Sequence, residues 1–422
     1  MSSHPSDSSD RLYQRMVEAF HEDSKTWRAV NLSLRDAIVD FAAQHCAYYR
    51  KLIQPSQPFE AIPLLTKTLI REHADDLLAE GIPENRRVAK RTSGSAGQPL
   101  EFFRDSIQGP AEDISAQRFL KRLHGVPEPS TMVWAAASPH TSTGVPGLDI
   151  HPLPVGALSP ERLRHEVLLW GRFRSYFLYG QASAIHWMAD QVRERGLEVQ
   201  RLPACVIATS DLLTEQAEQE IRDVFQCPVH SWYGSHEFNG FLAGTLPGTR
   251  RYAFNPLLCH VEVTDDAGQP VEPGNVGKLV VTDLNNHVFP FIRYDTEDLA
   301  TRARDEFVGG WRVIDRIEGR SSELLRFPSG RILSGTTLGQ FVLTKGDLGR
   351  FVRFYQCAQT GSNELELRIV WRGKPSNEVR SRVERALGSI ADPDTSIRTR
   401  DVEKLETLPS GKAWIVRTEF ER

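Results

Sequence analysis

Residues 204–233 read ACVIATSDLLTEQAEQEIRDVFQCPVHSWY, and this stretch decides the fold class. The apolar run 204–208 predicts a short buried strand, and residues 229–233 predict another. Between them, Thr214–Phe225 carries its apolar residues at helical spacing. Strand, helix and strand in this order are typical of a βαβ unit in a parallel sheet, so we expect an α/β protein.

The segments on either side add helices and a second kind of sheet. Ser183–Arg195 predicts an amphipathic helix that ends at Gly196, and residues 11–71 predict a helical lead that prolines interrupt. Downstream, His260–Thr264 and Lys278–Leu284 predict two strands joined by a turn rich in Asp, Gly, Pro and Asn. We therefore expect mixed and parallel sheets with a β-rich subdomain.

The C-terminal part of the chain begins a new pattern. A strand over Glu364–Trp371, a helix over Asn377–Leu387 and a strand over Ala413–Phe420 predict a small α+β domain. We expect this mobile domain to span residues 323–422, and the large N-terminal domain to span residues 11–320.

Length and composition exclude several classes of protein. The chain has 422 residues, 40% of them hydrophobic, and a net charge of −4, so it lacks the basic footprint of a nucleic-acid-binding domain. No apolar run is long enough to span a membrane, and the Ser-rich residues 1–10 are typical of a disordered lead without a signal-peptide core. We expect a cytoplasmic monomer or homodimer whose partners are small molecules, not nucleic acids or membranes.

The five cysteines are widely spaced and form no CxxC pair. Cys227 with His230 and Cys259 with His260 make an incomplete pattern of metal ligands. We therefore expect buried thiols, and neither a zinc site nor a disulfide framework.

The loop Thr92-Ser93-Gly94-Ser95-Ala96-Gly97-Gln98-Pro99 combines hydroxyl side chains with glycines. Its backbone N–H groups and hydroxyls can turn toward one point, which suits phosphate oxygens. It is not a Walker loop, because no Gly-Lys-Ser/Thr follows at the required spacing. A flexible connector has the same composition, so the loop alone leaves both interpretations open.

The segment Tyr233-Gly234-Ser235-His236-Glu237 directly follows the second strand of the βαβ unit. Because ligands bind at the carboxyl ends of parallel strands, Tyr233 can stack on a base and Glu237 can hold a divalent cation on phosphate oxygens. The alternative is a polar turn in which Tyr233 covers the edge of the sheet.

Three later segments carry further polar candidates. Within residues 285–298, Asp298 can accept both hydroxyls of a ribose, although a surface loop with an Arg–Asp pair would look alike. Arg320 can donate to ribose or phosphate oxygens, or can be an exposed residue of a linker. Lys412, on the tight loop 408–413, can stabilise charge that develops at an α-phosphate, or can be a solvated turn residue.

The order of these segments resembles the adenylate-forming superfamily, and more narrowly its phenylacetate–CoA ligase and CapK branch. The matching segments are residues 48–51, 63–68, 92–99, 208–211, 233–237, 293–299, 319–321 and 409–412. Each motif is weak alone, and their order and spacing carry the resemblance.

The resemblance implies a nucleotide site and a catalytic lysine. It implies that phosphates are held by Thr92, Ser93, Gly94, Ser95 and Gly97, and that the nucleotide is further bound by Ser210, Asp211, Tyr233, Gly234 and Asp298. Catalytic roles fall to Glu237, which would carry Mg²⁺, to Arg320 at the ribose, and to Lys412, which would bridge the α-phosphate and the carboxylate. The candidates for lining an acid pocket are Trp134, His140, Tyr179 and Phe238.

The chain departs from the family at informative positions. Gln98 stands where the phosphate loop usually has a lysine, and Glu297 replaces the usual glycine before Asp298. Some CapK-like relatives carry a Cys/His cluster after the Tyr-Gly-x-x-Glu segment. Residues 239–252 contain neither residue type, so we expect no structural zinc.

In function, the resemblance implies an ATP-dependent, AMP-forming ligase that uses Mg²⁺. It would activate a small carboxylic acid, aromatic or otherwise compact, as an acyl-adenylate and pass the acyl group to CoA or another nucleophile. The alternatives are a ligase that forms an amide or N–N bond, an adenylyltransferase that acts on a non-carboxylate, and a non-catalytic homologue that binds a nucleotide or an acyl group.

Overall fold

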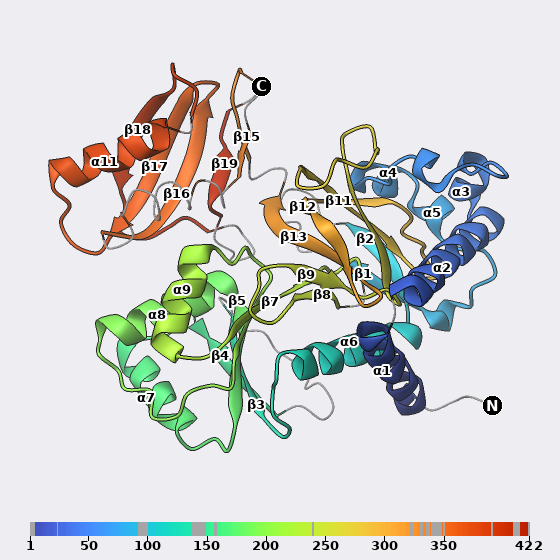
Figure 1. The fold of residues 1–422 in the computed structure, drawn as a ribbon, viewed down its shortest axis with the longest axis horizontal. Coiled ribbons are helices and arrows are strands. Elements are labelled where there is room, and N and C mark those ends of the chain that lie inside the picture. The colour runs from blue at the N-terminus through green and yellow to red at the C-terminus, as the bar shows by residue number, and fades with distance from the viewer. Residues whose placement is uncertain are drawn as a thin grey trace. The chain divides into compact units, whose positions relative to one another are not determined.

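The computed structural model of the protein is drawn as a ribbon in Figure 1. It describes residues 5–22, 24–91, 100–136, 149–155, 158–238, 240–320, 324–329, 332–334, 338, 348, 351–389, 391–407 and 414–420. The chain divides into two compact units. Unit 1 comprises Met1–Pro127 and His230–Ile317, and unit 2 comprises Glu128–Val229 and Glu318–Arg422.

Unit 1 begins with helices in the predicted lead of residues 11–71 and continues with two helices, over residues 74–77 and 108–123, that were not predicted. They are α1 (Pro5–His21), α2 (Ser24–His45), α3 (Ala47–Leu52), α4 (Lys67–Glu72), α5 (Ala74–Leu77) and α6 (Gln108–Leu123), with short 3₁₀ helices at Phe59–Ala61 and Glu84–Arg86. The first helix starts at Pro5, within the residues expected to form a disordered lead, because the fixed φ of proline suits a first helical turn. Its N-terminal half is also anchored, since the Ser115 hydroxyl of α6 donates to the Ser9 carbonyl at 2.9 Å.

The β-rich subdomain predicted for unit 1 is present. Its strands follow the order β10–β11–β12–β13–β9–β8–β7. Their bounds are β7 Val229–Gly234, β8 Phe241–Thr245, β9 Tyr252–Phe254, β10 Cys259–Thr264, β11 Val276–Asp283, β12 Tyr294–Val308 and β13 Trp311–Arg320. β10 and β11 pair antiparallel, which confirms the two strands expected on either side of the polar turn. A separate antiparallel pair consists of β1 (Arg87–Arg91) and β2 (Glu101–Asp105).

Unit 2 contains a parallel sheet with the order β6–β5–β3–β4. The strands and helices are β3 Thr131–Ala136, β4 Asp149–Pro154, α7 Pro160–Trp170, β5 Tyr176–Gln181, α8 Ala182–Glu194, β6 Val206–Thr209 and α9 Glu215–Phe225. Helices α8 and α9 confirm the two predicted helices, and Thr214 is the N-cap of α9 because its hydroxyl accepts from the Ala217 N–H. β6, α9 and β7 confirm the strand, helix and strand predicted over residues 204–233. A parallel βαβ unit is formed one step earlier in the chain, where α8 connects the parallel strands β5 and β6.

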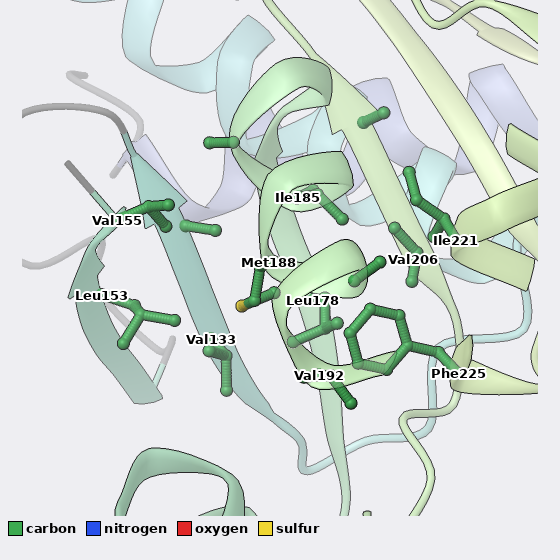
Figure 2. Packing of buried hydrophobic residues seen from close by; sticks show 14 of the residues in the cluster. Val133, Leu153, Val155, Leu178, Ile185, Met188, Val192, Val206, Ile221 and Phe225 are labelled. Carbon is green, nitrogen blue, oxygen red and sulfur yellow. The ribbon is translucent and has the colours of Figure 1, made fainter. Parts of the chain in front are cut away.

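The core of this parallel sheet lies between α8 and the strands. Figure 2 shows Met188 and Ile185 of α8 near Leu178 of β5, with Val133 of β3 close by. All four side chains are 0% exposed. Burial of apolar surface contributes roughly 25 cal/mol per Å². The packing therefore fixes α8 on the sheet. It also sets the positions of the ends of the strands, after which the predicted polar site residues of unit 2 follow in the sequence.

The described residues in the C-terminal part of unit 2 form a second sheet and the helix α11 (Asn377–Gly388), which agrees with the predicted small α+β fold. Its sheet has the order β18–β17–β16–β19. The bounds are β16 Val352–Gly361, β17 Glu364–Trp371, α11 Asn377–Gly388, β18 Ser396–Asp401 and β19 Val416–Thr418, and a short pair consists of β14 Leu324–Arg326 and β15 Ile332–Ser334. β17 and α11 confirm the strand and the helix expected there, whereas β16 and β18 were not predicted. The domain boundary near residues 320–323 stays a prediction.

Three further properties concern the described residues. None of their helices is both long and apolar enough to cross a membrane. The described part of the chain also holds no cluster of three or more His, Cys, Asp or Glu side chains suited to a metal ion. All five cysteines are free and buried, which confirms the expected buried thiols. Burial raises the pKa of Cys46 and of Cys205 to about 12.

Candidate functional site

Strand β7 carries the first candidate residues to its carboxyl end. Tyr233 and Gly234 are its last two residues, and Glu237 follows in the turn with 7% of its surface exposed. A Cβ atom at Gly234 would lie 2.3 Å from the Gly240 carbonyl oxygen, so only glycine fits this close approach. Gly234 therefore has a packing role, and its contact with a nucleotide stays a prediction.

Two tyrosine–carboxylate hydrogen bonds organise the site in unit 1. The Tyr233 hydroxyl donates to Asp298 Oδ2 at 2.7 Å, and the Tyr294 hydroxyl donates to Glu237 Oε1 at 2.8 Å. Burial, followed by the charge and the hydrogen bond of the partner carboxylate, raises the pKa of both tyrosines well above its usual value. Both hydroxyls therefore stay protonated, and each holds one oxygen of its carboxylate in a fixed direction.

Near its start, β12 bulges at residues 296–298, where its register against β11 shifts, and this bend, the turn that presents Asp298, is braced by its own side chains. Asp295 Oδ1 accepts from the Glu297 N–H at 2.9 Å, and Thr296 Oγ1 accepts from the Asp298 N–H at 3.2 Å. The Thr296 hydroxyl donates in turn to the Leu279 carbonyl at 2.7 Å. Glu297 has a φ of 64°, in the left-handed region that glycine adopts most readily. These bonds stabilise a backbone conformation that a glutamate would otherwise avoid.

Arg293, at the start of this segment, is a buried structural residue. It is 1% exposed, and its guanidinium donates to both oxygens of Glu262 at 3.0 and 3.1 Å. It also donates to the carbonyls of Glu60, Ile62 and Gly268, each at 2.6 Å. The alternative of an exposed loop with an Arg–Asp pair is therefore wrong, because this arginine is buried against a glutamate and three carbonyls.

In unit 2, the segment that follows β6 binds the N-terminus of α8. Asp211 Oδ1 accepts from the Ala182 N–H at 2.5 Å, and Oδ2 accepts from the Ser183 N–H at 3.2 Å. The carboxylate thus satisfies N–H groups that the first turn of a helix leaves without intrahelical partners. Ser210 has a φ of 71° and sits at the tip of this turn. The expected contacts of Ser210 and Asp211 with a nucleotide stay predictions.

The aromatic pocket candidates lie in two different settings. In unit 2, Trp134 of β3 and Tyr179 of β5 are register partners, half-buried, with ring centroids 6.3 Å apart. In unit 1, Phe238 is 2% exposed and packs near Phe291 and Tyr294, with ring centroids at 6.0 and 6.1 Å. Phe238 therefore occupies a core position, and among the pocket candidates that the structure describes, the pair in unit 2 has the partial exposure that a pocket wall requires.

Several predicted residues lie outside the described part of the chain. They are Thr92, Ser93, Gly94, Ser95 and Gly97 of the phosphate loop, His140, and Lys412. The phosphate loop is bracketed by the antiparallel strands β1 and β2. Arg320 is described, as the last residue of β13 and a member of unit 2.

Sequence reasoning missed two residues that the structure places beside the candidates. Tyr294, the partner of Glu237, lies inside the quoted segment 293–299 but was assigned no role. Lys67, in the quoted segment 63–68, pairs with Glu297 at 2.5 Å. In each case the motif was noticed, but the partner lies too far along the chain for spacing to reveal the contact.

The mixed α/β architecture, with its antiparallel and parallel sheets and small C-terminal α+β part, is similar to that of a CoA ligase of known structure. A crystal structure of 2-hydroxyisobutyryl-CoA ligase in the postadenylation state, in complex with 2-HIB-AMP, matches with a TM-score of 0.76 and 19% sequence identity. The match covers 96% of this chain and 92% of that one. No family model matches the chain.

Two curated proteins are related in sequence. The protein CapK of Staphylococcus aureus is 20% identical over an alignment 446 positions long, gaps included, which covers 95% of this chain and 92% of CapK. The phenylacetate-coenzyme A ligase of Thermus thermophilus is 24% identical over 311 residues, or 68% of each chain. The predicted resemblance to the adenylate-forming superfamily is confirmed by these relatives and by the fold.

Proposed function

We propose that the protein is an ATP-dependent, AMP-forming ligase that activates a small carboxylic acid as an acyl-adenylate and transfers the acyl group to CoA. One observation carries the proposal. Buried tyrosines fix the carboxylates of Asp298 and Glu237, the two residues that the resemblance assigns to ribose and to magnesium. The relatives named as CoA ligases support the same chemistry.

The first half-reaction needs alignment more than covalent help from the protein. An oxygen of the acid attacks the α-phosphorus of ATP, and pyrophosphate leaves with the electrons of the broken P–O bond. Asp298 accepts hydrogen bonds from the ribose hydroxyls, and Tyr233 keeps that carboxylate from rotating away. This fixes the sugar, and through it the α-phosphate, relative to the attacking oxygen.

Glu237 fits the magnesium that this chemistry uses. Mg²⁺ in nucleotide sites is commonly bound by one or two carboxylates together with substrate phosphates. The buried Glu237, oriented by Tyr294 at 2.8 Å, supplies one such carboxylate. Bound magnesium neutralises charge on the phosphates and on the leaving pyrophosphate. Lys412 and the loop 92–97 lie outside the described residues, and their roles at the α-phosphate and at the terminal phosphates stay predictions.

In the second half-reaction, the sulfur of CoA attacks the acyl carbon and AMP leaves. The same adenylate could pass to an amine, and a non-carboxylate could take the place of the acid in the first step. We propose CoA because relatives in both comparisons carry CoA ligase in their names. An aromatic or compact acid is proposed for the half-buried Trp134–Tyr179 pair, and a cytoplasmic monomer or homodimer remains our expectation.

A pyrophosphate-release screen tests the proposed function. Wild type is assayed with ATP, Mg²⁺ and a panel of carboxylic acids, with and without CoA, and the products are read by mass spectrometry. We expect acid-dependent pyrophosphate, an acyl-CoA product, and loss of both in Asp298→Ala and Lys412→Ala. ATP binding by calorimetry without pyrophosphate from any acid would instead identify a non-catalytic binding protein.

A further inference from the structure

The segment 63–68 was noticed in the sequence but has no part in the chemistry proposed above. In unit 1 it runs beside the start of β12. The Leu65 N–H donates to the Arg293 carbonyl and the Asp295 N–H donates to the Leu65 carbonyl, each at 2.9 Å, so Leu65 forms a parallel bridge with Tyr294. The segment is therefore hydrogen-bonded to the backbone immediately before the turn that presents Asp298.

An ion pair extends this contact into the turn itself. Lys67 Nζ lies 2.5 Å from Glu297 Oε2, and the two side chains are 17% and 37% exposed. The position of Lys67 is set locally, because it opens α4 directly after the N-cap Thr66, whose hydroxyl accepts from the Leu69 N–H at 3.3 Å. A cation on a fixed helix start is thus held against the acidic residue of the turn.

The pair has a specific consequence for the backbone. Glu297 has a φ of 64°, a conformation that costs free energy for any residue with a Cβ atom. The next residue is Asp298, whose Oδ2 accepts from Tyr233. If the turn relaxed toward an ordinary conformation, the direction in which Asp298 leaves the backbone would change, and its alignment with Tyr233 would be lost.

We propose that Lys67 is a positioning residue for nucleotide binding, which acts by holding Glu297 in the left-handed turn that presents Asp298 to the ribose. The proposal rests on the proposed function for the identity of the ligand. It assigns a role to the segment 63–68, and it accounts for how this chain accepts Glu297 where a glycine is usual.

The first test compares Lys67→Met with the matched control Lys51→Met. Lys51 also pairs with an acidic residue, Asp76 at 3.5 Å, but both members of this pair are exposed and lie outside the turn. We expect Lys67→Met to raise the KM for ATP and the Kd for ATP about fivefold, with kcat close to wild type, as loss of a part-buried ion pair implies. The increase should be smaller with 2′-deoxy-ATP, and Lys67→Arg should restore wild-type values.

The second test uses glycine to remove the need for the ion pair. Glycine adopts a positive φ without a side-chain penalty, so Glu297→Gly should bind ATP nearly as wild type does. Adding Lys67→Met to this variant should then have no further effect, and this readout remains usable even if Lys67→Met alone folds poorly. An equal rise in Kd in both backgrounds, or no rise in either, would overturn the proposal.

These outcomes are separable from failure of the proposed function. If wild type binds ATP but forms no pyrophosphate, the ligase activity is rejected while the Kd comparison still decides the role of Lys67. If wild type binds no ATP, both proposals are rejected together.

Discussion

At the scale of single residues, the site depends on neutral tyrosines that hold charged carboxylates. Tyr233 and Tyr294 are buried, and their carboxylate partners raise the pKa of each hydroxyl, so neither loses its proton in the ordinary pH range. A hydrogen bond from a neutral donor directs a carboxylate without cancelling its charge. The two tyrosines therefore orient Asp298 and Glu237 without adding a second charge to the site.

Tyr233→Phe should weaken nucleotide binding without unfolding the protein. Hydrogen bonds to charged groups contribute about 1.5 kcal/mol, which corresponds to roughly a tenfold rise in the KM for ATP. Steady-state kinetics measure this change. The control is Tyr355→Phe, because the Tyr355 hydroxyl is buried and has no hydrogen-bond partner among the described residues. Equal KM values for wild type and Tyr233→Phe would show that this hydroxyl does not direct Asp298.

The candidate site was predictable only where a motif carried the signal. Glu237 and Asp298 followed from the order of short motifs, and the structure brings each of them into contact with a buried tyrosine. Lys67 could not be predicted, because its partner Glu297 lies far along the chain and only the tertiary fold brings them together. The exposed-loop alternative for Arg293 failed for the same reason, since its partner Glu262 lies on another strand.

At the scale of elements, the end of one strand of the parallel sheet is joined to a helix that precedes it in the chain. The carboxylate of Asp211 caps the first turn of α8 through two N–H groups. This contact joins the end of β6 to the start of the helix that covers the parallel sheet. The sequence predicted α8 and β17 well because their apolar residues follow a regular period. It did not predict β18, because the segment Ser396–Asp401 is dominated by polar and charged residues.

Asp211→Ala should destabilise the protein by about 1–2 kcal/mol, an effect of the size seen on removing a helix N-cap, although the N-cap residue itself is Gln181, whose side chain makes no capping hydrogen bond. The reason is that two N–H groups of α8 lose their acceptor. Urea unfolding followed by circular dichroism measures the change in the free energy of unfolding. Asp211→Asn keeps one carbonyl oxygen and should lose less. An unchanged midpoint in Asp211→Ala would mean that solvent replaces the cap at no cost.

At the scale of the whole molecule, an ion-pair network joins distant segments within unit 2. Asp190 of α8 is 0% exposed and accepts from Arg353 at 2.5 Å and from Arg372 at 2.7 Å. Arg372 also reaches Glu220 of α9 at 2.8 Å. The C-terminal sheet is thus tied to α8 and α9 by charges that are largely removed from solvent, where screening by salt is weak.

This network predicts a defined loss of stability in acid. Burial alone would raise the pKa of Glu220, but the hydrogen bond from His186 and the charges of His186 and Arg372 outweigh it and lower the pKa from 4.5 to about 2. A lowered pKa in the folded state means that Glu220 contributes stability above pH 4.5 and loses that contribution as the pH falls toward 2. The contribution is on the order of 3 kcal/mol.

Glu220→Gln should therefore show a flatter dependence of unfolding free energy on pH across this window than wild type. Denaturant titrations at a series of pH values measure the slope. Glu198→Gln, at an exposed position, serves as the control and should follow wild type. Parallel curves for Glu220→Gln and wild type would contradict the lowered pKa.

The buried cysteines can report how often each unit of the native protein opens. Cys46 and Cys259 lie in unit 1, and Cys205, Cys227 and Cys357 lie in unit 2, all of them free and shielded from solvent. An alkylating reagent reacts with the exposed thiolate, so labelling of the native protein proceeds only through states in which a unit has opened. Mass spectrometry of the labelled peptides then gives the opening frequency of each unit separately, from one experiment on the unmodified chain.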